Sequence, residues 1–346
     1  MITMRIVKKE NKIMNCLEKT IDQYSENGIL EHIAVRVGQG DRVIYDTYRG
    51  GVDENTLFDM ASITKIMATT ALSLIALDKG SLILDDHVDK FFPTSKPLTI
   101  KNLLTHTIGV GHMSLNKEGN TYENIAQKIL ELPLAIPIGT DVRYSCPAFI
   151  LLGKIVEKIF GMPLNACFDE LVAKPLGLES TSFLPSNRQN AVNSNLDEKK
   201  RGVVNDYNCQ FLGGVAGNAG LFSNISDVTK YVNFLQRRGA PLISQQTFLT
   251  AAQNHTVGMT EARGLGFLYV DERYEQAGGL FPNGTIGHCG HTGQSLFVDH
   301  RSGFYVIILS DATISTVKKY GKEHYDRVKE MRARIHSAIK CDSENR

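Results

Sequence analysis

Short runs typical of β-strands lie near both ends of this chain, and helical patterns fill its middle. The strand-like runs are residues 33–37, 43–45, 266–270, 294–299 and 303–309. The helical runs are residues 11–26, 62–77, 100–104, 122–130, 147–160, 228–238 and 317–339. Strands so far apart in the sequence share a sheet only if the chain returns to its start. We therefore predict an α/β (α+β) fold: an antiparallel sheet of about five strands from both chain ends, flanked by helices, with an inserted mostly α-helical domain.

The expected division into domains follows from this order of elements. Residues 1–55 and 225–346 are expected to form the α/β domain and residues 56–224 the helical domain, with the active site at their interface. The chain has 346 residues, of which 42% are hydrophobic, and this is enough for a substantial core. Residues 185–205 are polar and aperiodic, so we expect a loop there.

Ser62 stands at the start of the most apolar helical run, three residues before Lys65. One helical turn places both side chains on the same face, and Lys65 is the only charged residue between Asp59 and Asp78. A helix this apolar is expected to be buried on most sides. The bare pattern Ser-x-x-Lys is common, however, and it occurs in this chain at Ser62, Ser114, Ser315 and Ser337.

This pairing of Ser62 with Lys65 suits covalent catalysis. Burial is expected to lower the pKa of Lys65, because desolvation disfavours the ammonium, and the neutral amine accepts a proton from a neighbouring hydroxyl. The helix N-terminus favours negative charge on the serine oxygen. A serine beside such a base is a candidate nucleophile for acyl transfer. The alternative is a helix-capping serine and a lysine whose stem packs while its amine reaches water.

Tyr144 is the candidate proton shuttle for this serine, because it directly precedes the apolar helix at residues 147–160. Tyrosine has an unperturbed pKa of about 10, so it acts as a base only where cations lower that pKa. Tyr122 and Tyr231 are each followed two residues later by asparagine, but both open ordinary amphipathic helices. A packing role for Tyr144 is the alternative.

A glycine-containing turn before the strand at residues 294–299 is the third candidate piece. It reads Gly290-His291-Thr292-Gly293-Gln294-Ser295, and the backbone N–H after Gly293 is a candidate oxyanion donor. An alternative role for this stretch is metal binding by His288, Cys289 and His291, but no second ligand cluster with suitable spacing accompanies them. The glycine-rich residues 213–220 lack the order of a nucleotide-binding loop.

Net charge and cysteine content limit the partners and the cellular compartment expected for this chain. The net charge is +1 and no long basic run occurs, so neither a nucleic-acid partner nor a membrane surface is indicated. The first 15 residues lack the apolar core of a signal peptide. The six cysteines show no C-x-x-C pair and no framework spacing, so a reduced, cytoplasmic protein is expected. The sequence does not indicate an oligomeric state.

With these pieces in this order, the chain resembles the serine β-lactamase and penicillin-binding protein superfamily. Within it, the resemblance is to the class C-like β-lactamase-related serine hydrolases, and Ser-x-x-Lys is a catalytic signature of the superfamily. The likeness extends over roughly residues 30–310. The matching segments are residues 57–65, 80–86, 103–107, 138–140 with Tyr144, 151–153, 213–223 and 290–293.

The resemblance implies a role for each candidate residue. Ser62 would be the acylated nucleophile, Lys65 its proton acceptor and Tyr144 the partner acid and base. The backbone N–H groups of Ser62 and Gln294 would form the oxyanion hole. The substrate-binding residues would be Cys146 and the Lys-Thr-Gly equivalent His291, Thr292 and Gly293, with Thr292 free to bind a substrate carboxylate. No metal or organic cofactor is implied.

Two departures from the family pattern bear on the substrate. Cys146 stands where the family commonly has an asparagine, and a thiol replaces that amide poorly as a hydrogen-bonding group. His291 replaces a lysine, so its charge is expected to vanish near an ordinary pKa of about 6.5. We therefore expect an acyl-enzyme serine hydrolase acting on a small ester, amide or peptide, with poor β-lactam turnover. The alternatives are a D-alanyl-D-alanine carboxypeptidase, penicillin-binding protein or β-lactamase, an acyltransferase, and a catalytically silent binding relative.

Overall fold

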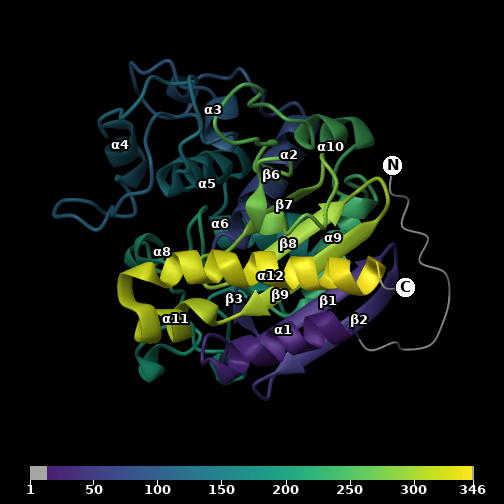
Figure 1. The fold of residues 1–346 in the computed structure, drawn as a ribbon. Helices are drawn as coiled ribbons and strands as arrows, with labels where there is room; N and C mark the ends of the chain where they lie inside the picture. The colour runs from purple at the N-terminus through teal and green to yellow at the C-terminus, as the bar shows by residue number, and fades with distance from the viewer. Residues whose placement is uncertain (1–13, 345–346) are drawn as a thin grey trace.

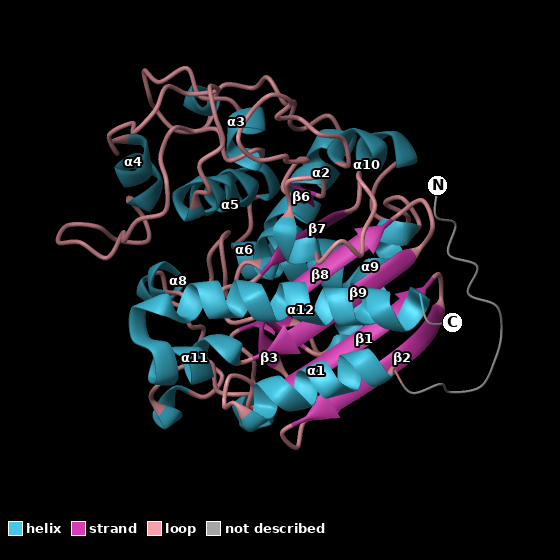
Figure 2. Cartoon of the chain, in the orientation of Figure 1, coloured by secondary structure: helices cyan, strands magenta, loops and turns pink. Residues whose placement is uncertain are grey.

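The central element of the computed structural model, which describes residues 14–344, is a six-stranded antiparallel sheet (Figures 1 and 2). Its strand order is β2-β1-β9-β8-β7-β6. The strands are β1 (Ile33–Gln39), β2 (Arg42–Arg49), β6 (Leu268–Tyr269), β7 (Ile286–Cys289), β8 (Ser295–Asp299) and β9 (Phe304–Ser310). Strands β1 and β9 pair along their whole length, from Ile33 opposite Ser310 to Gln39 opposite Phe304. The two ends of the chain therefore build one sheet, as the sequence predicts.

Side chains of β9 alternate between two cores, as a strand buried on both faces requires. Val306 and Ile308 contribute to the core under α1 (Asn15–Glu26) and α12 (His324–Glu344), which cover one face of the sheet in Figure 1. Tyr305 and Ile307 belong to the larger core on the opposite face, which includes α9 (Ile225–Gln236). The sheet is thus enclosed by helices on both sides.

The middle of the chain is mostly helical. A wide π-helical segment, Lys65–Thr70, leads into α2 (Ala71–Asp78), and both pack against α5 (Cys146–Phe160). The other helices are α3 (Ile100–Leu104), α4 (Ile125–Leu130), α6 (Leu164–Phe168), α7 (Lys174–Leu176), α8 (Tyr207–Phe211), α10 (Gln245–Ala251) and α11 (Ala312–Tyr320). A small second sheet has the order β3 (Phe58–Asp59), β5 (Leu221–Ser223), β4 (Ser182–Phe183).

The five predicted strands are confirmed, and β7 is the strand of the six-stranded sheet that the sequence analysis missed, while β4 and β5 of the second sheet were not predicted either. It is short and contains Gly287, a residue that weakens a strand pattern. A Cβ at Gly287 would lie 2.1 Å from the backbone oxygen of Leu296 on β8, so close strand approach requires glycine here. The predicted division into two domains remains a prediction.

The last helix was predicted as one element over residues 317–339, and this is wrong. The chain forms two helices, α11 and α12, separated at Gly321, whose φ of +55° and ψ of −117° end the first helix. The helix predicted over residues 11–26 is confirmed from Asn15 onward, and residues 11–13 lie outside the described part of the chain.

Two cysteines distant in the sequence are joined. Cys16 on α1 and Cys341 on α12 form a disulfide, so the expectation that all six cysteines are reduced is wrong for this pair. The remaining cysteines are free thiols: Cys146, Cys167, Cys209 and Cys289. Within residues 14–344 no helix has the length and apolar character needed to cross a membrane.

Candidate active site

Ser62 lies on a tight turn between β3 and the π-helical segment. Ala61, directly before it, has a φ of +44°, a conformation that costs energy in a residue with a Cβ. The turn is held by Asp59, whose Oδ1 accepts the backbone N–H of Ala61 at 2.8 Å. Asp59 is buried, and burial raises the pKa of its carboxyl to about 6. A strained and anchored turn thus fixes the position of the Ser62 hydroxyl.

The structure brings together the three residues predicted as catalytic. The Nζ of Lys65 donates to the Ser62 Oγ at 3.0 Å, and the Tyr144 hydroxyl lies 2.6 Å from the same oxygen. Lys65 is fully buried, and its Nζ also donates to the Asn218 carbonyl at 2.9 Å and contacts the Cys146 sulfur at 3.5 Å. One serine oxygen therefore contacts both an amine and a phenol.

The protonation of this pair differs from the expectation. Burial opposes the charged form of Lys65, but the neighbouring Cys146 and Tyr144 outweigh burial, and the pKa of Lys65 is raised. Burial also raises the pKa of Tyr144, to about 12, although Lys65 acts in the opposite direction. The prediction of a lowered Lys65 pKa is wrong for the resting site. Lys65 is charged there, and Tyr144 is neutral.

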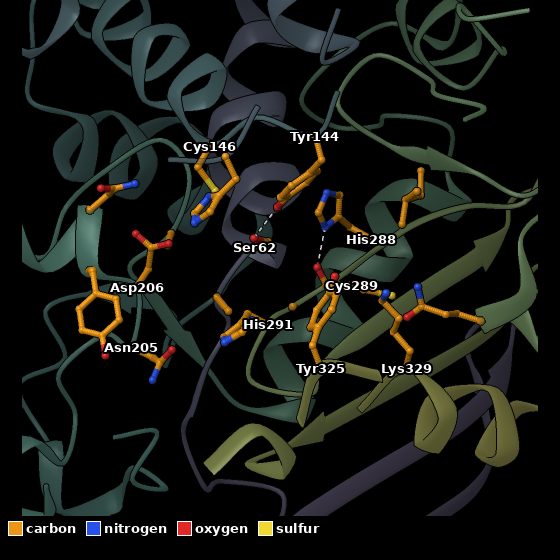
Figure 3. Close-up of a pocket in the computed structure, with 18 of the residues that line it drawn as sticks. Ser62, Tyr144, Cys146, Asn205, Asp206, His288, Cys289, His291, Tyr325 and Lys329 are labelled. Carbon is orange, nitrogen blue, oxygen red and sulfur yellow. Dashed lines mark hydrogen bonds between the residues drawn. The ribbon is translucent and has the colours of Figure 1, made fainter. Parts of the chain in front are cut away.

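Ser62 opens into a cavity of about 900 Å³ (Figure 3). In the figure the Tyr144 side chain points toward Ser62, and Cys146 lies beside them. Cys146 begins α5, while α12 forms part of the opposite wall with Tyr325, Lys329 and Arg332. Residues 205–208 line a third side. The volume suits a small-molecule substrate.

Thr292, Gly293 and Gln294 do not line this cavity. The Thr292 hydroxyl donates a hydrogen bond to the Asp59 carbonyl oxygen at 3.1 Å and also contacts the Gln294 side chain. The Gln294 amide donates to the Ser310 carbonyl at 3.0 Å, and a Cβ on Gly293 would meet the Ser310 hydroxyl at 2.2 Å. These three residues form the buried turn between β7 and β8, so the structure does not bring them to Ser62.

Three residues earlier, a second His-x-Gly sequence does line the cavity. His288 and Cys289 lie at the end of β7, and Gly290 and His291 follow them. The backbone N–H groups of Ser62 and His291 both belong to cavity-lining residues, and neither has an acceptor within residues 14–344. Arg332 fixes this stretch, because its guanidinium donates to the carbonyls of Gly290 and Gly293.

His291 lines the cavity, but it is neutral at ordinary pH. Although the side chain is exposed at the cavity, desolvation by the surrounding walls lowers its pKa to about 4. The nearby His324 and Arg332 lower it further, because they repel an additional positive charge. The expectation that His291 carries a charge up to about pH 6.5 is therefore wrong.

Arg263 is a cavity residue that the sequence analysis missed. Its side chain is 3% exposed, and its Nη2 donates to the Glu261 carboxylate at 2.7 Å. The Nε and Nη1 groups have no partner among the described residues. The guanidinium carbon lies 5.6 Å from the Tyr144 ring centre. No sequence pattern around Arg263 signals this position, which follows from the antiparallel bridge between Arg263 and Leu268 at the start of β6.

Comparisons with known proteins show the family to which this chain is similar. A family model described as Beta-lactamase matches residues 17–328. Esterase EstB of Burkholderia gladioli is 28% identical, over 85% of this chain and 89% of the esterase. A protein of Escherichia coli (strain K12) named "Putative D-alanyl-D-alanine carboxypeptidase" is 27% identical, over 76% of this chain and 70% of that protein. The solved structure of EstCE1, described as a hydrolase with promiscuous acyltransferase activity, has a TM-score of 0.73 at 21% identity, covering 93% and 98% of the two chains.

Proposed function

This chain belongs to the Beta-lactamase family and is a serine hydrolase, and from that premise we propose that it cleaves a small ester or amide through an acyl-enzyme on Ser62. The observation that supports this most is the contact of one oxygen, the Ser62 Oγ, with both Lys65 at 3.0 Å and Tyr144 at 2.6 Å. A serine that only caps a helix, or a tyrosine that only packs, does not require a lysine and a tyrosine to contact one serine oxygen in a cavity.

In the proposed acylation, the Ser62 Oγ attacks the substrate carbonyl carbon and its proton passes to the Tyr144–Lys65 pair. The pair then gives this proton to the leaving group as its bond to the carbonyl carbon breaks, and the acyl group stays bonded to the Ser62 Oγ. In deacylation, water attacks the acyl carbon and gives a proton to the pair, which passes it to the Ser62 Oγ as the acyl–oxygen bond breaks and the acid leaves. For the oxyanion we propose the N–H groups of Ser62 and His291, with His291 in place of Gln294.

The resting site holds one proton too many for this chemistry. Lys65 is charged and Tyr144 is neutral, so neither accepts the Ser62 proton until the pair has lost one of its own. Because the two groups contact the same oxygen, the pair is best treated as one titrating unit. The proposal therefore includes a preference for alkaline solution.

The proposal is tested with purified protein on a panel of four substrate types: short neutral acyl esters, amides of the same acyl groups, D-amino-acid peptides and a chromogenic β-lactam. We expect the esters to have the highest kcat/KM. Ser62→Ala serves as the inactive control for each substrate. Ester hydrolysis at an undiminished rate by Ser62→Ala would contradict the proposal. If β-lactam turnover dominates, the β-lactamase alternative is favoured.

A D-alanyl-D-alanine carboxypeptidase is the second candidate, and Arg263 is the observation that favours it. Its guanidinium is buried in the cavity wall and its Nε and Nη1 groups have no partner among the described residues, so we propose that a small local shift on binding lets one of them donate to a substrate carboxylate. Arg263→Gln should then raise KM for a peptide with a free carboxylate and leave KM for its amidated counterpart nearly unchanged. Equal effects on both peptides would exclude this role.

A cytoplasmic location is likewise our proposal. The four free cysteines within residues 14–344 support it, since unpaired thiols are typical of reducing compartments, whereas the Cys16–Cys341 disulfide is the opposing feature. Cell fractionation with an antibody against the protein tests it.

A further inference from the structure

Cys146 occupies an unusual place for a buried thiol. It is the first residue of α5, a helix of 15 residues whose N-cap is Ser145. The N-terminus of a helix carries partial positive charge, which stabilises a thiolate relative to a thiol. Proline at position 147 removes one further backbone donor from this turn, but it does not change the direction of the helix dipole. The fold thus places the sulfur at an electropositive helix end.

Two side chains add to this environment. The Lys65 Nζ lies 3.5 Å from the Cys146 sulfur, and His112, which lines the same cavity, also favours the thiolate form of Cys146. Asp206 acts in the opposite direction, and burial also favours the neutral thiol. The cations outweigh both, so the pKa of Cys146 is lowered. Cys146 is therefore part of a cysteine–lysine–histidine cluster.

The sulfur is reached through the substrate cavity. Cys146 is 3% exposed and lines the cavity together with Ser62 and His112. A second cavity cysteine, Cys289, is more exposed, but its sulfur lies 3.2 Å from the Tyr274 hydroxyl, and no lysine, arginine or histidine within residues 14–344 bonds to that sulfur. Cys167 and Cys209 are buried outside the cavity, and burial raises the pKa of both. Cys289, Cys167 and Cys209 therefore serve as reference thiols against which the reactivity of Cys146 is compared.

We propose that Cys146 is an oxidation site, at which small hydroperoxides that enter the substrate cavity convert the thiolate to a sulfenic acid and thereby stop acyl transfer at Ser62. The Cys146 sulfur attacks one peroxide oxygen, so that an S–O bond forms as the O–O bond breaks. The sulfur loses two electrons to the leaving oxygen, which departs as alkoxide or hydroxide and takes a proton from solvent or protonated His112.

Inhibition follows from the shared contact with Lys65. The Lys65 Nζ contacts both the Cys146 sulfur and the Ser62 Oγ, so an oxygen added to the sulfur competes with Ser62 for the same ammonium. The added oxygen also occupies space beside the nucleophile. An external thiol reverses the change: it displaces water from the sulfenic acid to give a mixed disulfide, and a second thiol releases Cys146.

The inhibition in this inference rests on the proposed function, whereas the reactivity of the thiol does not. We therefore measure reactivity in the Ser62→Ala protein, which has no acyl transfer to lose. Iodoacetamide is applied between pH 5.5 and 9, and each cysteine peptide is quantified by mass spectrometry. Cys146 should be alkylated at least about tenfold faster than Cys289 at pH 6.5, as for a cysteine stabilised as its thiolate. Lys65→Met and His112→Asn should each shift its pH profile to higher pH.

Function is measured separately with hydrogen peroxide on the active protein. Residual ester hydrolysis should fall, dithiothreitol should restore it, and dimedone should label Cys146 as the sulfenic acid. Each cysteine variant is compared with its own untreated sample: Cys289→Ser should stay sensitive, and Cys146→Ser should become resistant. Peroxide sensitivity that persists in Cys146→Ser, or faster alkylation of Cys289 than of Cys146, overturns the inference. Loss of ester hydrolysis without Cys146 labelling also overturns it, while absence of any hydrolysis with normal Cys146 labelling overturns only the proposed function.

Discussion

The Tyr144 hydroxyl and the Ser62 Oγ lie 2.6 Å apart, although 82 residues separate them in the chain. The N-terminal end of α5 and the turn after β3 meet at this point, and Lys65, the first residue of the π-helical segment that follows the turn, is the third member.

A covalent probe should identify the nucleophile. A fluorophosphonate should add one group per chain, on the peptide containing Ser62, because this hydroxyl contacts both Lys65 and Tyr144. Ser114 is a matched control: it lines the same cavity and also begins a Ser-x-x-Lys sequence, but its hydroxyl has no such contacts among the described residues. Labelling should persist in Ser114→Ala and disappear in Ser62→Ala. Peptide mass spectrometry shows whether the label lies on the peptide containing Ser62 or on the one containing Ser114.

Lys65 and Tyr144 should act as one proton-transfer unit. Lys65→Ala and Tyr144→Phe should each lower kcat/KM by about 10²-fold or more, and the double variant should be little worse, because residues that act together give non-additive losses. Tyr122→Phe is the control, since its hydroxyl bonds to Glu157 at 2.5 Å, away from Ser62. Independent, multiplicative losses would assign Tyr144 a packing role.

Activity should rise with pH. The productive pair lacks a proton, and the pKa values of both Lys65 and Tyr144 are raised, so the productive fraction grows by about tenfold per pH unit below the lower of them. We expect kcat/KM for a neutral ester to increase from pH 6 to 9 without reaching a plateau. Cys146→Ala should move the rise to lower pH, because it removes an interaction that raises the Lys65 pKa. A rate that is already constant at pH 7 would contradict this.

Between pH 5.5 and 8, KM for a carboxylate-bearing substrate should stay nearly constant. With a pKa of about 4, His291 is already neutral at pH 5.5, so no charge is lost over this interval. His291→Lys should lower KM for that substrate if a cation at this position reaches the carboxylate. A neutral ester of the same size is the control in each measurement. A KM that climbs severalfold through pH 6.5 for the unsubstituted protein would mean that His291 is charged in the complex.

Asp59→Asn should lower the free energy of unfolding at pH 7 by about 1–3 kcal/mol, because an amide NH₂ would face backbone donors that now bond to a carboxylate. The carboxylate accepts from Ala61 N–H, Asn205 N–H and the Ser194 hydroxyl. Its pKa of about 6 lies above the ordinary 3.8, so its titration adds stability that is fully present below pH 3.8 and is lost as pH rises through 6. As the pH falls from 7 to 4, the free energy of unfolding of the unsubstituted protein should therefore exceed that of Asp59→Asn by an increasing amount. Urea titrations at several pH values measure this difference, and a constant difference would contradict the raised pKa.

The sequence predicted the fold and the Ser62–Lys65–Tyr144 group because each depends on local signals. Apolar strand runs marked β1 and β9, and a serine at the start of an apolar helix marked the candidate nucleophile. The third motif was harder to place, because two His-x-Gly sequences follow each other at residues 288–290 and 291–293. Gly287 masks the strand pattern of β7, so the sequence alone favours the later copy as the third motif. The structure brings the earlier copy to the cavity.

The protonation states could not be predicted from the sequence because they depend on contacts between distant segments. The sulfur that raises the pKa of Lys65 belongs to a residue 81 positions away. The lowered pKa of His291 likewise requires α12, since His324 and Arg332 stand at the start and middle of that helix. Composition and periodicity contain no information about these distances.

The bonds from Arg332 to the carbonyls of Gly290 and Gly293 have a consequence for biosynthesis. Ser62 is translated early, but the loop at residues 290–293 beside it is fixed by α12, which follows every strand in the sequence. Protein synthesis proceeds from the N-terminus, so a nascent chain contains Ser62 long before that loop is locked. We expect the growing polypeptide to be inactive on the ribosome and to acquire activity only after α12 has emerged and docked.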